Sequence, residues 1–181
     1  MTQVIILLAD GFEEAEALVP ADLLRRAGAE VLLVSADNQE VVTGSHGIRV
    51  FADRPLSGLD IRNARCLFLP GGKAGTERLG ANAQVKAMIR TAVENGLLIA
   101  AICAAPSILG AQGYLDGRRY TCYPGFETAM PNGIRSQNRI EQDDIFLTGE
   151  GMGVAHEFGL RMVRLLFGQT TETELREKTR T

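Results

Sequence analysis

The stretch LLIAAICAAP, residues 97–106, decides the fold, because it places a single thiol at the end of a strongly apolar run. A run of this kind is typical of a strand buried on both faces of a parallel sheet. If the strand ends at Ile102 and a helix starts near Ala104, Cys103 lies on the sharp turn between them. Such a turn is a nucleophile elbow. The helix N-terminus would then lower the thiol pKa, and the Ala104 amide would stabilise an oxyanion. The alternative is an inert core cysteine.

Other short apolar runs alternate with helical patterns along the chain, and we expect each of them to form a strand. They are QVIILLA (3–9), VLLVSA (31–36), CLFLPGG (66–72) and IFLT (145–148), while residues 43–53 indicate a turn and a strand. Apolar periodicity predicts helices at about 13–28, 85–95 and 154–166, and one more in the charged tail. This alternation predicts a three-layer α/β/α sandwich around a mainly parallel, flavodoxin-like sheet. Ligands of such sheets bind at the carboxyl ends of the strands.

Length and composition restrict the class of protein. The 181 residues fit one domain, residues 1–181, and a net charge of −3 with scattered Lys and Arg favours neither nucleic-acid nor membrane partners. Three cysteines cannot all pair and match no zinc spacing, which favours a reducing compartment. The apolar run at 4–9 is too short for a signal peptide, and no run is long enough to span a membrane. We therefore expect a cytoplasmic protein.

Two further strand ends carry candidate chemistry. Gly71 and Gly72 would let backbone N–H groups approach a ligand and complete an oxyanion hole, unless they form only a plain turn. Glu13, Glu14 and Glu16 open the first helix, where acidic residues offset the helix dipole. One of these carboxyls could instead share a proton with a nearby thiol and act as an acid or base. No metal site is expected, because no histidine lies near them in sequence.

The two histidines bear on whether Cys103 has a partner base. A papain-type pair would need His46 or His156 beside the sulfur. We expect His156 to be exposed or to cap a helix, and we leave His46 open because loops can reach a site. The segment GEGMG, residues 149–153, lacks the spacing of a dinucleotide fingerprint, so we expect a tight turn and no cofactor.

Taken together, the motifs resemble the ThiJ/PfpI superfamily, and within it the subgroup of the Parkinson's disease-associated protein deglycase. The motifs that carry the resemblance, in order, are ADGFEEAEA (9–17), LLRRAGAEV (23–31), LPGG (69–72), AAICAAP (100–106) and LTGEGMGVAHEFGL (147–160). The resemblance implies that Cys103 is the reactive, readily oxidised elbow cysteine and that Glu16 is a carboxyl held protonated against it. It implies an oxyanion pocket of Gly71, Gly72 and Ala104, homodimers, and cofactor-free activity on methylglyoxal, glyoxal or early glycation adducts.

Several positions depart from the pattern of the family. Ala104 replaces the histidine of protease-like relatives, so a Cys–His protease dyad of that kind is absent. Tyr123 stands where many relatives have a histidine, and a phenol is a poorer base near neutral pH. Relatives often have an arginine near the position of His46. They commonly have a cation at the position of Glu150 and a proline at the position of Met152. These changes affect the polarity of the pocket and hence the substrate.

Two functional hypotheses follow from the same residues. In the first, Cys103 and Glu16 form a glyoxalase or deglycase-type enzyme, with Tyr123 and His46 as further candidate pocket residues. In the second, oxidation of Cys103 to a sulfinate makes the protein a redox sensor or a redox-regulated stress chaperone. The two hypotheses require the same side chains, so turnover is what separates them.

Overall fold

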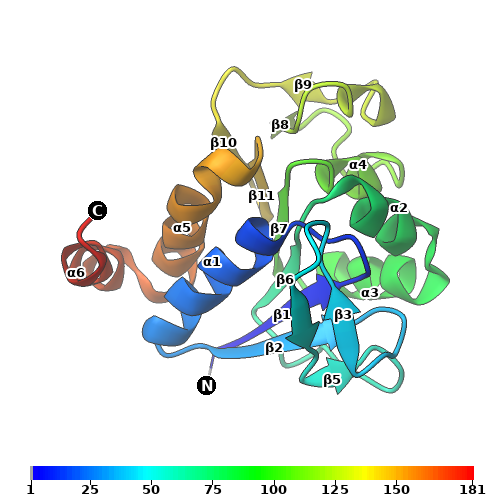
Figure 1. The fold of residues 1–181 in the computed structure, drawn as a ribbon. Coiled ribbons are helices and arrows are strands. Elements are labelled where there is room, and N and C mark those ends of the chain that lie inside the picture. Colours follow the sequence, from blue (N-terminus) through cyan, green and yellow to red (C-terminus); the bar gives the residue numbers. More distant parts are fainter. Residues whose placement is uncertain (1) are drawn as a thin grey trace.

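A computed structural model describes residues 2–181 and shows a central seven-stranded sheet between two helical layers (Figure 1). The strands run in the order β10-β11-β7-β6-β1-β2-β5, and all are parallel except the edge strand β10. The sheet comprises β1 (Gln3–Leu8), β2 (Glu30–Ser35), β5 (Arg54–Pro55), β6 (Cys66–Leu69), β7 (Leu98–Ile102), β10 (Ile140–Asp143) and β11 (Phe146–Gly149). Its five main parallel strands follow the flavodoxin-like order. The predicted sandwich is therefore confirmed.

Alternating side chains of the strands feed two apolar cores, one on each face of the sheet. On β1, Ile5 and Leu7 face one core, whereas Val4, Ile6 and Leu8 face the other. The helices of the first face are α2 (Lys73–Ala81), α3 (Ala83–Glu94) and α4 (Pro106–Gly110). Those of the second are α1 (Glu14–Arg26), α5 (Ala155–Phe167) and α6 (Gln169–Thr179). No helix among residues 2–181 is long and apolar enough to cross a membrane.

Smaller elements lie outside the main sheet. A hairpin of β3 (Val41–Thr43) and β4 (Arg49–Phe51) carries the loop with His46, and β8 (Arg119–Tyr120) pairs with β9 (Ile134–Arg135). Short 3₁₀ turns span Glu127–Ala129 and Met152–Val154. The segment 149–153 forms the turn between β11 and α5, as predicted.

The helix expected directly after the thiol differs from the prediction. It begins at Pro106 instead of near Ala104 and is only five residues long. Proline is well tolerated in the first turn of a helix because its missing N–H would be unpaired there. Residues 103–105 form the turn itself. Cys103 therefore lies before the helix, and a short helix gives its sulfur little help from a dipole.

Candidate functional site

Three neighbouring parallel strands end at one place, and each contributes to the site. The order of the sheet reverses at the boundary between β1 and β6, and β7 is the next strand along. Glu16 follows β1, Gly71 and Gly72 follow β6, and Cys103 follows β7. A ligand-binding crevice is expected outside the carboxyl ends at such a reversal point. The structure therefore brings together the residues that the sequence placed at separate strand ends.

Cys103 has the strained backbone of an elbow. Its φ is 64°, which is a left-handed backbone conformation that residues other than glycine rarely adopt. Both of its backbone groups are held: its N–H donates to the Gly149 carbonyl and its carbonyl accepts from the Tyr123 N–H, each at 2.9 Å. Such strain persists only where the surroundings enforce it, and it is concentrated at functional sites. The elbow predicted for Cys103 is thus present.

Glu16 lies against the sulfur and is 1% exposed. Its carboxyl and the Cys103 side chain lie together beside Gly71, and its Oε2 accepts from the Gly71 N–H at 2.9 Å. Within residues 2–181, its Oε1 is buried and has no hydrogen-bond partner. A buried polar atom without a partner is costly, and more so when it is charged, so this environment disfavours the ionised form of Glu16.

Burial and mutual repulsion govern the ionisation of this pair. Burial raises the pKa of Glu16 to about 7, against the hydrogen bonds from Cys103 and Gly71. Burial and the neighbouring Glu16 charge raise the pKa of Cys103 to about 12, and they outweigh the Gly72 and Ala104 N–H groups that point at the sulfur. The expected lowering of the thiol pKa is therefore wrong in direction. Between these two values the pair holds one proton.

Two adjacent glycines let the backbone pack against the reacting groups. A Cβ on Gly71 would overlap the Glu16 carboxyl and lie 2.6 Å from the Cβ of Cys103. Gly72 has a φ of 88° and packs against the backbone of Gly11 and Glu13. Gly71 donates to the carboxyl and Gly72 to the sulfur. The predicted oxyanion donors are thus reduced to Gly72 and Ala104, and Gly71 positions Glu16 instead.

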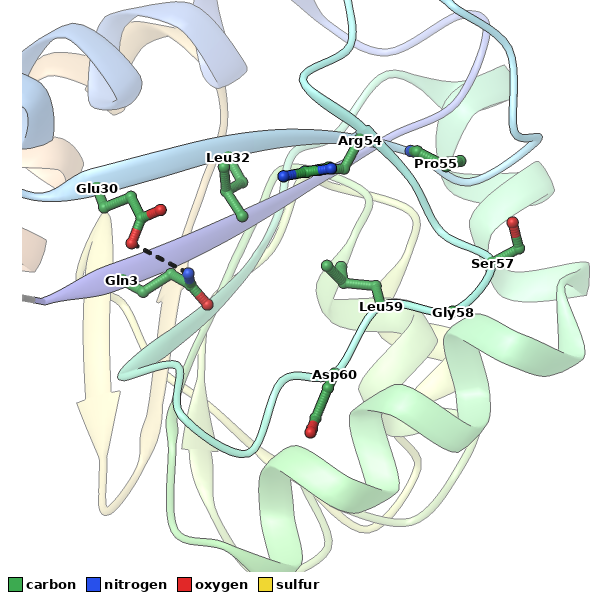
Figure 2. Close-up of a pocket in the computed structure, with 9 residues that line it drawn as sticks. All are labelled: Gln3, Glu30, Leu32, Arg54, Pro55, Ser57, Gly58, Leu59 and Asp60. Carbon is green, nitrogen blue, oxygen red and sulfur yellow. Dashed lines mark hydrogen bonds between the residues drawn. The ribbon is translucent and has the colours of Figure 1, made fainter.

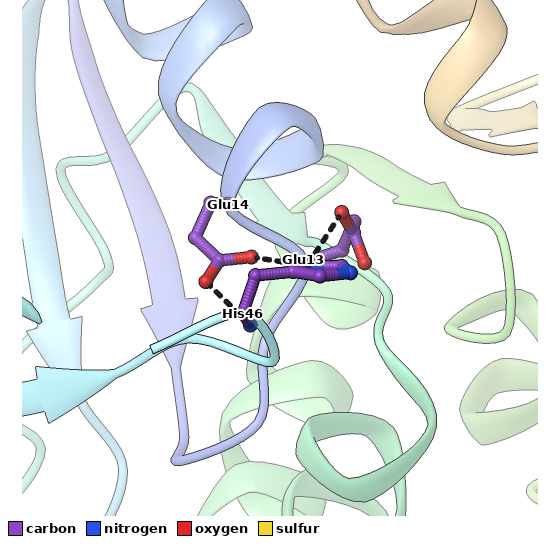
Figure 3. A group of neighbouring side chains, drawn as sticks. All are labelled: Glu13, Glu14 and His46. Atoms are coloured by element: carbon purple, nitrogen blue, oxygen red, sulfur yellow. Dashed lines mark hydrogen bonds and ion pairs between the residues drawn. The ribbon is translucent and has the colours of Figure 1, made fainter. Parts of the chain in front are cut away.

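His46 belongs to a different cluster, at the tip of the β3–β4 hairpin (Figure 3). Its Nδ1 lies 3.1 Å from Glu14 Oε2 and 3.6 Å from Glu13 Oε1, and its N–H donates to Glu14 Oε1 at 2.8 Å. The hydrogen bond to Glu14 raises the pKa of His46. Among the hydrogen bonds described for residues 2–181, none joins His46 or His156 to Cys103. A papain-type pair is therefore not formed.

The same cluster could hold a cation, since the ligand atoms of Glu13, Glu14 and His46 lie within 4.8 Å of one another. No metal site was expected because no histidine is close to these glutamates in sequence. The fold nevertheless places His46 beside them. The Glu14 carboxylate, however, already accepts from the backbone N–H groups of His46 and Ile48 and from the Ser45 hydroxyl. These contacts give the cluster a structural role that requires no ion.

Tyr123 lies at the rim of the site and is 52% exposed. Its ring stacks edge-on against Phe126, with a centroid separation of 6.5 Å. The turn that follows β11 also reaches this rim, through Gly151 and Met152. Sequence reasoning treated residues 149–153 as a turn and missed Gly151, although its place at a strand's carboxyl end was a usable signal. Glu150 forms an ion pair on this turn, in which Arg139 Nε donates to the Glu150 carboxylate at 2.8 Å.

A separate hollow of about 360 Å³ lies at the far edge of the sheet (Figure 2). Its lining includes Gln3 and Glu30, the first residues of β1 and β2, together with Arg54 and Asp60. Gln3 Nε2 donates to Glu30 Oε2 at 3.1 Å. Because this hollow includes the amino ends of parallel strands and is lined by no cysteine, it is not the site that Cys103 belongs to.

Comparison with known proteins agrees with this geometry. A model of the DJ-1/PfpI family matches residues 2–165. Protein DJ-1 homolog B of Arabidopsis thaliana is 37% identical over 175 residues, which is 96% of this chain but only 40% of that protein. A Pyrococcus abyssi protein named as a deglycase is 38% identical over 130 residues, or 72% of this chain and 77% of that protein.

The fold is shared with solved relatives as well. The crystal structure of a cysteine-to-alanine mutant of a DJ-1 superfamily protein from Salmonella typhimurium has a TM-score of 0.93 to this chain at 35% identity. The match covers 99% of this chain and 98% of that one. These matches confirm the resemblance found in the sequence motifs. The chain belongs to the DJ-1/PfpI family.

Proposed function

We propose that the protein is a cofactor-independent, cysteine-dependent enzyme of the glyoxalase or deglycase type. Its substrates would be small dicarbonyls, such as methylglyoxal and glyoxal, or their early glycation adducts. The observation that carries the proposal is the strained Cys103 held against the buried Glu16 carboxyl, with two backbone N–H groups pointing at the sulfur. The family membership and the relative named as a deglycase support it.

The arrangement supplies each group that the reaction needs. The sulfur of Cys103 attacks the aldehyde carbon and forms a hemithioacetal, while the thiol proton passes to Glu16. Glu16 passes that proton to the new hemithioacetal oxygen, and the regenerated carboxylate then carries a proton from this carbon to the adjacent carbonyl carbon through an enediol. The first carbon is thereby oxidised to a thioester as the second is reduced to an alcohol. Water cleaves the thioester and releases a 2-hydroxy acid. The Gly72 and Ala104 amides stabilise the charged oxygen intermediates.

The pKa of Glu16, raised to about 7, suits this role. A group that both accepts and returns a proton works best with a pKa near the working pH. The high pKa of Cys103 means that its proton leaves as the sulfur attacks, through the carboxylate beside it. The carboxyl therefore acts first as a base and then as an acid.

The test is hydroxy-acid production from methylglyoxal by the wild type and by Cys103→Ala at equal concentration. We expect the variant to lose at least about a hundredfold in kcat/KM, because the covalent intermediate cannot form. Cys122→Ala serves as the matched control, since this second cysteine is fully buried. Equal turnover by the wild type and Cys103→Ala would refute the enzyme hypothesis.

A redox role of the same cysteine remains the second candidate. Cys103 is partly exposed, whereas Cys66 and Cys122 are buried. Two equivalents of a peroxide would convert the Cys103 thiolate to a sulfinate and release two waters. A protonated Glu16 would donate a hydrogen bond to a sulfinate oxygen. Absence of Cys103-dependent turnover, with stoichiometric oxidation by peroxide, would favour this sensor or stress-chaperone role.

We further propose that the protein is a cytoplasmic homodimer. Its three cysteines are free, as suits a reducing compartment. Phe51 and Ile48, on the β3–β4 hairpin, are 71% and 54% exposed. Apolar side chains so exposed are often covered by a partner, and a second copy of this chain is the partner proposed here.

A further inference from the structure

Both backbone groups of the strained Cys103 are held by hydrogen bonds from outside the elbow. The Gly149 carbonyl accepts from the Cys103 N–H, and the Tyr123 N–H donates to the Cys103 carbonyl, each at 2.9 Å. This carbonyl belongs to the same trans peptide group as the Ala104 N–H, which points at the sulfur. A trans peptide group is planar, and its two polar groups point in opposite directions. The bond from Tyr123 therefore also fixes the direction of the Ala104 N–H.

The segment that carries Tyr123 is itself anchored by a hydroxyl of β11. Residues 121–123 follow β8 and belong to no strand, so no sheet ladder holds them. The Thr121 N–H donates to Thr148 Oγ1 at 2.9 Å, and this hydroxyl donates to the Glu141 carbonyl of β10 at 3.3 Å. Thr121 and Thr148 are 4% and 1% exposed, so little water reaches this bond. The segment thus depends on a buried side chain for its position.

We propose that Thr148 is a positioning residue, whose buried hydroxyl anchors residues 121–123 and thereby holds the Ala104 N–H against the Cys103 sulfur. Consecutive residues of β11 then control both backbone groups of the elbow, since Gly149 binds the N–H directly and Thr148 acts on the carbonyl through the segment. A buried N–H that loses its acceptor is costly, so without this hydroxyl the segment shifts to find another partner. The peptide group after Cys103 then turns with it. Only the effect of Thr148 on turnover rests on the proposed function, because the effect on the thiol does not need a substrate.

The test is the second-order rate constant for alkylation of Cys103 by iodoacetamide in the wild type and in Thr148→Val. Mass spectrometry of the peptide that contains Cys103 measures it, well below the melting temperature of both proteins. Valine keeps the branched shape of threonine and lacks the hydroxyl. We expect the rate constant to fall by about 5- to 10-fold, because an N–H turned away no longer stabilises the thiolate. For methylglyoxal, kcat should fall by a similar factor while KM changes by less than about twofold, since the amide acts on charged intermediates.

Thr76→Val is the matched control for the loss of a buried hydroxyl. Thr76 is 4% exposed, and its hydroxyl has no hydrogen-bond partner within residues 2–181. This variant should be alkylated at the rate of the wild type. A purely structural role of Thr148 would lower the Tm of Thr148→Val and leave its alkylation rate unchanged or raised by local opening. Either of these rates would overturn the proposal.

A second pair of variants, Thr148→Ser and Thr148→Ala, differs by the hydroxyl alone and gives the same test if the valine variant does not fold. The serine variant should react at nearly the rate of the wild type, and the alanine variant about 5- to 10-fold more slowly. Equal rates in the two would overturn the proposal. Slower alkylation without the hydroxyl, together with no turnover of methylglyoxal by the wild type, would support the role of Thr148 and refute the enzyme. The two failures are therefore distinguishable.

Discussion

At the scale of single residues, burial of the Glu16 carboxyl lowers the stability of the folded protein near neutral pH and raises the pKa of this acid. Its pKa rises from 4.5 to about 7 in the folded protein. The folded state therefore holds a proton that the unfolded state releases, and stability falls as pH rises from about 4.5 to 7. A shift of this size corresponds to about 3 kcal/mol. Such a cost is retained where a site needs an acid near neutral pH.

We predict that Glu16→Gln removes this pH dependence. Relative to the wild type, the variant should gain about 3 kcal/mol in free energy of unfolding between pH 5 and pH 8, because an amide is not ionised. Urea denaturation at the two pH values measures the gain. A stability difference that is the same at pH 5 and pH 8 would show that Glu16 is not buried against the thiol as described.

The sequence contained enough to find the nucleophile but not its ionisation. The apolar run up to Ile102 marked a buried strand, so Cys103 had to lie at its carboxyl end. The direction of its pKa shift depends on the depth of burial and on the distance to Glu16, which lies 87 positions away in the chain. Neither quantity leaves a local pattern. The same holds for His46, whose contact with Glu14 exists only because a hairpin folds back onto α1.

At the scale of elements, the start of α1 anchors the β3–β4 hairpin. The Glu14 carboxylate accepts the N–H groups of His46 and Ile48, at 2.8 and 3.4 Å. Gly44 lies so close that a Cβ there would overlap this carboxyl. Burial alone would raise the pKa of Glu14, but the hydrogen bonds lower it to about 2. Its contribution to stability is therefore present above about pH 4.5 and is lost as pH falls toward 2.

We predict that Glu14→Ala lowers the free energy of unfolding by about 1–2 kcal/mol at pH 7, because partly buried N–H groups lose a charged acceptor. Urea denaturation monitored by circular dichroism measures the loss. Glu77→Ala, an exposed glutamate of α2, is the matched control and should stay within about 0.5 kcal/mol of the wild type. If both variants behaved alike, the hairpin would not depend on this anchor.

The elements that sequence reasoning found and missed differ in how they are stabilised. The main parallel strands are buried on both faces and read as unbroken apolar runs, so they were predicted. Helix α2 carries Gly75 and Gly80, poor helix formers that hid its pattern. Helix α4 is only five residues long, too short to show a period. Strand β10 has three polar residues, and only Glu141 is buried, so no apolar run marked it.

At the scale of the whole molecule, the two main helices of the second layer pack against each other at very short range. A Cβ on Gly159 of α5 would lie 2.8 Å from Leu23 Cδ1 and 2.9 Å from Pro20 Cα in α1. The second atom is backbone and cannot move aside by rotating a side chain. The helix α1 also carries Glu16, so the packing of this layer fixes the carboxyl against β7. Fold and site are thus stabilised by the same contact.

We predict that Gly159→Ala destabilises the protein, although alanine is the better helix former. Separation of the two helices should cost about 1–3 kcal/mol, which lowers Tm by several degrees in a chain of this length. The control is Gly80→Ala, the same change in α2, where the new Cβ would meet only Ile108 at 3.6 Å. That variant should be stabilised by up to about 1 kcal/mol, since alanine favours the helix. Differential scanning calorimetry should therefore show a lower Tm for Gly159→Ala and an equal or higher Tm for Gly80→Ala. A Gly159→Ala protein as stable as Gly80→Ala would contradict the close packing of α5 on α1.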